Sequence, residues 1–370
     1  MNATPPTPRY NAPDPRPRPA SDFGFGPPPA PRSGSVFQPQ RQTDGSAADA
    51  PAASSLTVRD RLAVHLAWEV VLAFLLVVLV VIFLISNGGT QIGIVISQAG
   101  VFGLMATGMA FSLRTGAPNL AVGAIAVFTG GLGGYMIAQG GWNRLLALTV
   151  VVVLATLFGV VMGAVAAALS VPAWAITLAG AVAIEMLTQL ITDGRVMPVQ
   201  FLDNYSTLWF LLFLLVSVGG GILWQRDEVR RRLGAARDAT DPAKRAGGTA
   251  ALGMLIGITG SSFLSALGGV ALLMRLSGSP GPSGLHMTMV ALAAALFGGV
   301  SMYGRRAGVA GTTLALLFVT GITTLVAFSG AEQQVTHLIV ALFVVLGAGV
   351  TRVLEAMSAN TSVFLPGYRR

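Results

Sequence analysis

A ten-residue stretch between two long apolar runs carries the clearest chemical signal in the chain. The stretch, Thr115-Gly-Ala-Pro-Asn-Leu-Ala-Val-Gly-Ala124, holds a proline, two glycines and an asparagine. Irregular backbone at bilayer depth is stable only where protein buries it or where it lines a watery cavity. Breaks of this kind mark substrate sites in transporters. We therefore expect a solute site or gate at this break, with Asn119 lining it, capping the helix that follows, or both.

Other polar side chains lie inside apolar segments and could contact a hydroxylated solute. Glu185 is a carboxylate within an expected membrane span, where an ionisable group is costly and is functional by default. Polar residues accompany it at helical spacing, and Gln98 is an amide in an earlier apolar run. Hydrogen bonds between neighbouring helices are the alternative role for all of them. The predicted solute pathway comprises Gln98, Asn119, Thr177, Glu185, Thr188 and Gln189, and Thr192 extends the same polar stripe.

Several classes of chemistry are disfavoured by what the sequence does not contain. Cysteine is absent, and the three histidines, His65, His286 and His337, lie far apart in the chain. No Gly-x-x-x-x-Gly-Lys-Ser/Thr phosphate loop is present, so the chain is not expected to bind and hydrolyse ATP in that manner. We predict a non-catalytic protein with no metal site and no cofactor of its own.

The elements that position these residues are predicted to be membrane-spanning helices. Of the 370 residues, 53% are hydrophobic and only 10% are charged, whereas soluble domains carry about 25% charged residues. The predicted fold is all-α and polytopic, with about ten spans and with the third, fifth, eighth and ninth as candidates for partial or re-entrant helices. Glu69, near the start of the first span, is expected at the membrane interface. The spans are predicted near His65–Ser86, Gly93–Leu113, Leu120–Ala138, Leu145–Leu169, Pro172–Ile191, Thr207–Trp224, Thr249–Met274, Met287–Met302, Val309–Phe328 and Thr336–Val350.

The positions of the basic residues predict the orientation of these spans. The net charge is +8, and its arginines and lysines gather in alternate loops. If both termini are cytoplasmic, three arginines fall in outside loops and the rest of the clusters fall inside, as the positive-inside rule requires. This distribution explains the charge without a nucleic-acid partner. The outside arginines are Arg144, Arg195 and Arg275; the inside clusters include Arg59, Arg61, Arg114, Arg226, Arg230, Arg231, Arg232, Arg237, Lys244, Arg245, Arg305, Arg306 and Arg352.

The chain divides into a membrane domain and two tails. Residues 1–57 are polar and Pro-rich and are predicted to be a disordered cytoplasmic tail. Residues 58–356 form the predicted permease domain, with a long cytoplasmic loop at 225–248, and residues 357–370 form a C-terminal cytoplasmic tail. The loop begins with a short amphipathic helix from Asp227.

A weak internal similarity suggests an inverted repeat. Thr115-Gly-Ala-Pro118 is echoed by Ser277-Gly-Ser-Pro280, and a short apolar helix is expected after each. Five spans separate the two copies, so they would enter the membrane from opposite sides. Chance similarity between Gly-rich segments is the alternative.

Four motifs in order resemble those of a transporter family. They are Ser97-Gln-Ala-Gly to Ala124 including Ala106-Thr-Gly-Met-Ala-Phe, then Val171-Pro-Ala-Trp-Ala-Ile-Thr-Leu178, Thr192-Asp-Gly194, and Gly298-Gly-Val-Ser-Met-Tyr-Gly-Arg-Arg-Ala-Gly-Val-Ala-Gly-Thr312. Together they resemble the permease subunits of ABC importers for ribose and similar simple sugars, in the superfamily shared with branched-chain amino-acid and nucleoside permeases. Asn119 replaces an Asp usual in the sugar permeases, Ala121 replaces a Ser, and Glu185 stands where an Arg is common.

The resemblance implies partners and a coupling site. Such a chain would pair with a second permease chain, like or unlike, and bind an ATPase that carries ATP and magnesium. A solute-binding protein would deliver the substrate, and the setting would be the lipid of a bacterial inner membrane. The cytoplasmic loop keeps part of the family's coupling-helix pattern, with a solvated basic loop as the alternative. The implied ATPase-coupling residues are Asp241, Pro242, Ala243, Lys244, Arg245 and Gly247.

Three other functions remain open on the sequence. Asn119-Leu120 also resembles nucleoside-type permeases of the same superfamily, so a nucleoside or branched-chain amino acid could be the solute. A proton-coupled secondary transporter could use Glu185 as its titrating group. The altered motifs would also suit a membrane scaffold that has lost transport.

Overall fold

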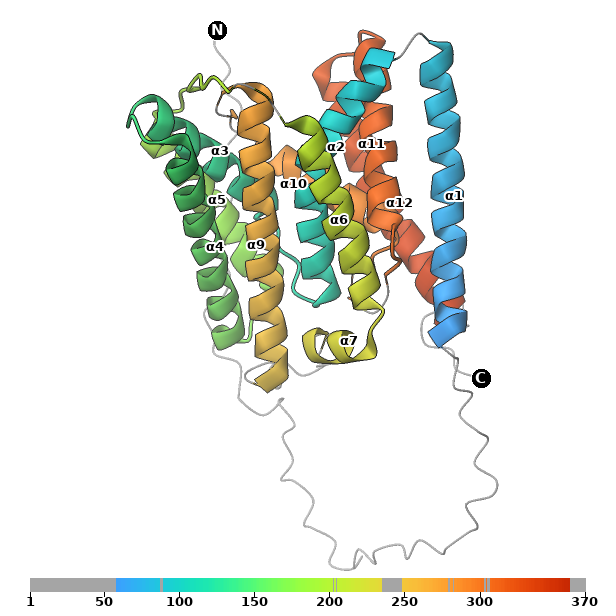
Figure 1. Ribbon diagram of the computed structural model, residues 1–370. Coiled ribbons are helices and arrows are strands. Elements are labelled where there is room, and N and C mark those ends of the chain that lie inside the picture. Colours follow the sequence, from blue (N-terminus) through green and yellow to red (C-terminus); the bar gives the residue numbers. More distant parts are fainter. Residues whose placement is uncertain are drawn as a thin grey trace, which may run out of the picture. The chain divides into compact units, whose positions relative to one another are not determined.

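The computed structural model describes residues 58–86, 89–201, 203, 205–234, 248–278, 280–281, 283–302, 304 and 307–359. Eleven α-helices occupy these residues, and the only bridge between extended segments joins Pro198 and Gly278. The prediction of an all-α fold is confirmed. The helices are α1 (Val58–Ile85), α2 (Gly89–Arg114), α3 (Val122–Ala138), α4 (Arg144–Leu169), α5 (Ala173–Thr192), α6 (Ser206–Trp224), α7 (Asp227–Leu233), α9 (Gly248–Leu276), α10 (Gly284–Phe297), α11 (Gly311–Phe328) and α12 (Gln333–Ala359) (Figure 1).

Ten of these helices correspond to the ten predicted spans. Eight are long and apolar enough to cross a membrane, and α3 and α10 are shorter apolar helices. The predicted third and eighth spans are therefore partial, as expected from the break before each. The fifth and ninth, α5 and α11, are full-length helices because no Gly- or Pro-rich break interrupts them.

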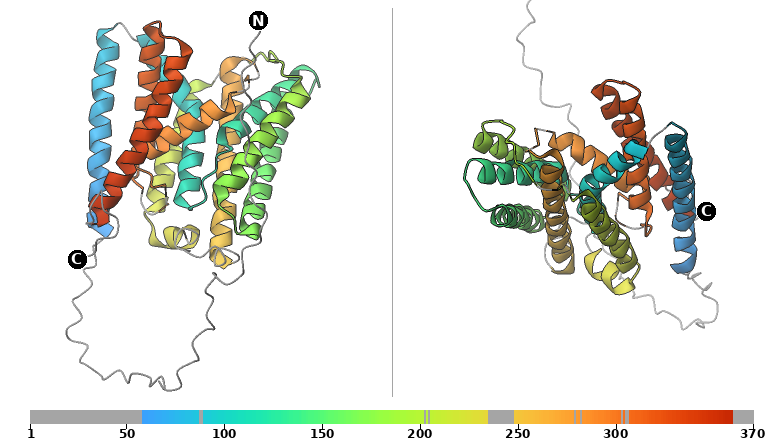
Figure 2. Two further views of the ribbon diagram at one scale, coloured as in Figure 1. Left: turned by 180° about the vertical axis from the view of Figure 1, so that it is seen from behind. Right: turned by 45° about the horizontal axis from the view of Figure 1, so that its top comes forward.

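The helices differ sharply in how much of their surface other helices cover. In their most apolar stretches α2 and α9 are 67% and 61% buried, whereas α1, α4, α6 and α12 are 17–28% buried. Helices α2 and α9, which pack against each other, are thus the most covered of the long helices. Figure 2 shows the bundle from behind and with its top tilted forward. A strongly apolar helix that stays uncovered is suited to contact with lipid.

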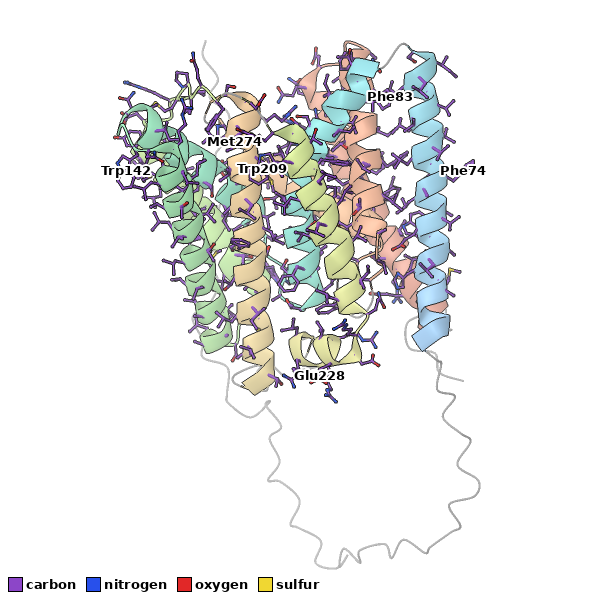
Figure 3. All side chains as sticks on the ribbon, in the orientation of Figure 1. Phe74, Phe83, Trp142, Trp209, Glu228 and Met274 are labelled. Carbon is purple, nitrogen blue, oxygen red and sulfur yellow. The ribbon has the colours of Figure 1, made fainter. Side chains whose placement is uncertain are left out.

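The outer helix α1 shows this two-sided environment within its own length. Phe74 is exposed, whereas Phe83, nine residues or two and a half turns later, is buried. Figure 3 shows Phe74 on the outer side of α1 and Phe83 on the side toward α2. One face of α1 therefore packs on the bundle and the other is left for the hydrocarbon.

The two short helices begin next to each other in the centre of the bundle. A Cβ added to Gly123, near the start of α3, would lie 2.0 Å from the carbonyl oxygen of Gly284, the first residue of α10. The amide of Gly123 donates to the Thr288 hydroxyl at 3.1 Å. The first copy of the suspected repeat ends at the start of α3, and the second lies shortly before α10; the repeat itself stays a prediction.

The long loop at 225–248, predicted to be cytoplasmic, is described only in part. Its first segment forms α7, in agreement with the expected amphipathic helix, and α7 packs against α9 and α6 at one end of the bundle (Figure 1). The implied coupling residues, Asp241 to Gly247, lie outside the described residues, as do the predicted tail up to residue 57 and residues 360–370. The predicted C-terminal tail began at residue 357, but α12 continues to Ala359.

Candidate solute pathway

Asn119 is buried where α3 leaves the break, beside the middle of α9. Its side-chain oxygen accepts a hydrogen bond from the amide of Ala121 at 3.0 Å. Its amide nitrogen lies 3.3 Å from the Ser261 hydroxyl and 3.2 Å from that of Ser262, and can donate to both. Because Ser261 and Ser262 lie at the centre of the 29-residue α9, the break lies deep in the bundle. Asn119 therefore stabilises the start of α3.

The break is closed by protein on its other sides as well. The hydroxyl of Thr177, on α5, accepts from the amide of Leu120 at 3.1 Å and donates within its own helix to Ala173 at 2.9 Å. Ser112 accepts from the amide of Asn119 at 3.1 Å. Nearby hydroxyls and one amide thus satisfy backbone groups that the break frees, as irregular backbone deep in a membrane bundle requires.

Replacing Asn119 by alanine should therefore lower stability. The substitution leaves the amide of Ala121 and two serine hydroxyls without their partner, at a cost of about 1–2 kcal/mol. Thermal unfolding of the detergent-solubilised chain measures the effect. Asn119→Asp keeps the acceptor for Ala121 and should lose less; an equal loss in both variants would contradict the capping role.

Glu185 lies where the starts of α3 and α10 meet. Its Oε2 lies 2.8 Å from the position of a Cβ added to Gly284, and that position is also 2.9 Å from the Cα of Ala124. Helix N-termini carry partial positive charge, so a carboxylate at two converging N-termini is stabilised there. This placement accounts for an acidic side chain inside an apolar segment without requiring a proton-transfer role.

The remaining residues of the α5 stripe border a very small pocket. Thr188 and Gln189 line about 20 Å³ of space beside α3 and the segment before α10, which is room for about one water. Thr188 and Thr192 donate to carbonyls of their own helix, Ile184 and Thr188. Thr188 and Thr192 therefore bond within α5, whereas Thr177 of the same stripe bonds to the backbone of the break.

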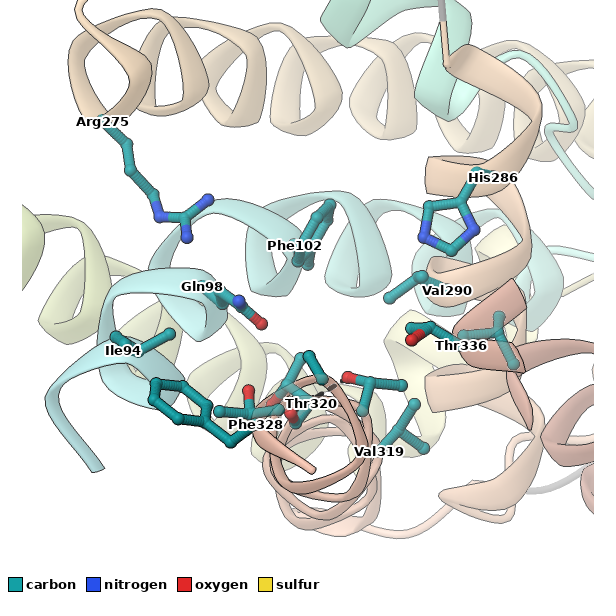
Figure 4. A pocket seen from close by; sticks show the side chains of 14 residues that line it. Ile94, Gln98, Phe102, Arg275, His286, Val290, Val319, Thr320, Phe328 and Thr336 are labelled. Atoms are coloured by element: carbon teal, nitrogen blue, oxygen red, sulfur yellow. Dashed lines mark hydrogen bonds between the residues drawn. The ribbon is translucent and has the colours of Figure 1, made fainter. Parts of the chain in front are cut away.

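A larger cavity lies elsewhere, between α2 and α11. Its volume is about 240 Å³, which corresponds to about eight water-sized groups at about 30 Å³ each. Of the six predicted pathway residues, only Gln98 lines it. Figure 4 shows Gln98 facing Thr320 of α11, with Arg275 and His286 on other sides of the cavity. The lining residues are Ile94, Gln98, Phe102, Arg275, His286, Val290, Val319, Thr320, Thr323, Thr324, Ala327, Phe328, Thr336 and Val340.

The cavity offers hydrogen-bonding groups at helical spacing. Thr320, Thr323 and Thr324 lie on one face of α11, and Thr336 adds a fourth hydroxyl from α12. Thr324 is only 3% exposed and its hydroxyl has no hydrogen-bond partner in the described structure. A buried hydroxyl without a partner is costly unless water or a ligand satisfies it. This face of α11 is therefore suited to a hydroxylated solute.

These threonines are not among the predicted pathway residues, although three of them have helical spacing in the sequence. Arg275 is predicted to lie in an outside loop, and the histidines carry no predicted role. In the fold the rings of His286 and His337 lie 4.1 Å apart, and among the described residues no third metal-ligating side chain joins them. The two histidines are far apart in the sequence, so their proximity could not be predicted. They meet because α10 and α12 pack against each other.

Glu69, expected at the membrane interface, does not extend out of the bundle. It is buried, and its Oε1 accepts from the amides of Ala310 and Gly311 at 2.8 and 3.0 Å, at the start of α11. Arg114, buried at the end of α2, donates to the carbonyl of Gly308 at 3.2 Å. The two opposite charges therefore hold the same short segment before α11, at the end of the bundle remote from the cavity.

Comparison with known proteins places the chain among transport permeases. The family described as branched-chain amino acid transport system / permease component matches residues 91–349. The ribose import permease protein RbsC of Haemophilus influenzae is 26% identical over 268 residues, covering 68% of this chain and 83% of that protein.

Two further relatives are also named as transport permeases. The inner membrane ABC transporter permease protein YjfF of Escherichia coli is 26% identical over 290 residues, covering 70% of this chain and 84% of that protein. The autoinducer 2 import system permease protein LsrC of Photorhabdus luminescens is 26% identical over 241 residues, covering 62% and 72%. No solved structure matches significantly. The chain is a multi-pass membrane protein and belongs to the ABC-importer permease family, whose members are non-catalytic transmembrane subunits.

Proposed function

We propose that this chain is the translocation subunit of an ATP-driven importer for a sugar or a similar small polar metabolite. The observation that carries the proposal is the cavity of about 240 Å³, with its four threonines and Gln98. A hydroxylated solute can satisfy these groups, including the hydroxyl of Thr324. A branched-chain amino acid presents an aliphatic side chain that would leave them without partners.

The proposed assembly follows from the family and from the distribution of charge. Two permease chains, the same or different, would bind a separate ATPase that carries ATP and magnesium, and a solute-binding protein would deliver the substrate. Family membership and the basic residues Arg230, Arg231 and Arg232 of α7 support a cytoplasmic position for that end of the bundle, in a bacterial inner membrane. The cavity would then lie in the outer half of the membrane, close to the delivered solute.

Within this proposal the six predicted pathway residues have different parts. Gln98 contacts the solute in the cavity. Glu185, Thr188 and Gln189 border the route where α5 meets the short helices, and Asn119 and Thr177 hold the break in shape. Coupling to the ATPase involves α7 and the Asp241–Gly247 segment that follows it.

ATP-dependent uptake into proteoliposomes tests the proposal. The permease is reconstituted with its ATPase and binding protein, and uptake of labelled ribose and fructose is measured. Uptake that needs ATP and persists in Glu185→Gln supports an importer and excludes proton coupling through Glu185. Uptake driven by a proton gradient without ATPase would contradict it, as would an absence of uptake for every polar solute tried.

Thr324→Val is expected to weaken solute recognition in this assay. Loss of one hydrogen bond costs about 0.5–1.5 kcal/mol, so the concentration for half-maximal uptake should rise about three- to tenfold. Thr149→Val is the matched control, because Thr149 is exposed on α4 and its hydroxyl bonds only within that helix. Equal effects of the two variants would show that the cavity is not the solute site.

A further inference from the structure

Arg275 brings a permanent positive charge to the wall of the cavity. It lies in the last turn of α9, and its Nε donates to the hydroxyl of Ser97 on α2 at 3.2 Å. Ser97 is in turn hydrogen-bonded to Ser206 on α6. This contact fixes the guanidinium beside Gln98, as Figure 4 shows, and leaves its two terminal nitrogens for other partners.

The cavity has no negative charge to balance this arginine. Among its lining residues Arg275 and His286 are the ionisable groups, and none is an aspartate or glutamate. His286 is covered on one side by His337, which is also not an anion. In the described structure no carboxylate forms an ion pair with Arg275. Arg114, by contrast, has the carboxylate of Glu69 bound to the same backbone segment that it contacts itself. A partly buried cation that no protein carboxylate neutralises is attractive to an anion.

The position of Arg275 at a helix C-terminus does not account for this arrangement alone. The C-terminal end of α9 favours a cation by about 0.3–1 kcal/mol, and that preference would be met equally by a side chain pointing away from the bundle. Instead the guanidinium is held toward α2 and the cavity by Ser97. The free end of the guanidinium is a planar fork, which matches a carboxylate in bidentate geometry.

We infer that the cavity binds a hydroxylated monocarboxylate, such as a sugar acid, in preference to a neutral sugar. This inference rests on the proposed function and narrows its substrate class. The carboxylate pairs with Arg275, and the hydroxyls of the same molecule meet Gln98 and the α11 threonines. Two independent observations support this inference. Arg275 is a cation without a counter-charge in the cavity wall, and the hydroxyl of Thr324, which also lines the cavity, has no hydrogen-bond partner in the described structure.

Binding of ribose and ribonate tests the inference, because the two compounds share a five-carbon hydroxylated skeleton and differ in charge. Equilibrium binding of each labelled compound is measured on the purified full-length chain in nanodiscs. Ribonate should bind at least about tenfold more tightly, as expected for a charge-assisted bidentate contact. Arg275→Gln should remove this preference by weakening ribonate about tenfold while changing ribose less than about twofold.

Arg144→Gln is the matched control, since Arg144 is also at a helix end on the same side of the bundle but lies over the Phe201 ring, outside the cavity. It should leave both affinities unchanged. Equal binding of ribose and ribonate, or an equal loss of both in Arg275→Gln, overturns the inference while the sugar-importer function stands. If neither compound binds, and if Thr324→Val and Thr149→Val have equal effects on uptake, then the cavity is not the solute site. The inference is then overturned together with the assigned site.

Discussion

Gly123→Ala is expected to prevent the two short helices from meeting and to leave little folded protein. The added methyl group would lie 2.0 Å from the Gly284 carbonyl oxygen and 2.7 Å from the backbone nitrogen of Thr288. Both contacts are backbone atoms at helix starts, so no side-chain rotation relieves them. Overpacking typically costs about 1–3 kcal/mol, and a clash with backbone on this scale belongs at or above the upper end. Thermal unfolding and recovery of monodisperse protein in detergent measure the loss.

Gly219→Ala is the matched control for that substitution. Gly219 also lies within an apolar helix, α6, and a Cβ there meets nothing within 4 Å. Alanine in a helix is favoured over glycine by about 0.5–1 kcal/mol, so this variant should be as stable as the parent or slightly more so. If Gly123→Ala behaves like Gly219→Ala, the starts of α3 and α10 do not meet as described.

Glu69→Ala is expected to produce the second large effect. The substitution removes the acceptor of the Ala310 and Gly311 amides and leaves the buried charge of Arg114 without its nearest counter-charge. A hydrogen bond to a charged group contributes about 1.5–3 kcal/mol, so losing both amide contacts should cost several kcal/mol. Loss of thermal stability and of ATP-dependent uptake should appear together, because the segment held by Glu69 begins the cavity-lining α11.

Two comparisons separate this effect from a general intolerance of substitution. Glu332→Ala removes an exposed carboxylate and should change stability little. Glu69→Gln keeps an oxygen for the two amides while losing the charge, so its effect should lie between those of the parent and Glu69→Ala. A Glu69→Ala variant as stable as Glu332→Ala would show that Glu69 does not hold the start of α11.

The spans and their breaks could be predicted because both follow from local chemistry. Long apolar runs must be helical in lipid, and Pro118 with its flanking glycines interrupts such a helix wherever it lies. The position of that break within the bundle could not be predicted. It depends on Ser261 and Ser262 of α9, more than 140 residues away, which reach Asn119 only in the folded chain.

The candidate site was predicted only in part for a related reason. Gln98 and Glu185 stand out because single polar groups in apolar segments are conspicuous. The threonines of α11 are less conspicuous, since a hydroxyl can bond within its own helix, as Thr320 does to Leu316 at 2.7 Å. Arg275 was assigned to a loop because a charge near the end of a span is ordinarily interfacial. Its contact with Ser97 depends on how α9 packs against α2.

The most direct test of the account is whether water and solute reach the α11 face of the cavity. The chain contains no cysteine, so Thr323→Cys introduces a single thiol at the cavity wall, and Thr149→Cys introduces one on the exposed face of α4. The rate of labelling by a water-soluble thiol reagent is measured in membranes with and without a transported solute. We predict that Cys at position 323 is labelled and that the solute slows the reaction, while the rate at position 149 does not change with solute. Labelling at 323 that is absent, or that no transported solute affects, would contradict a solute site between α2 and α11.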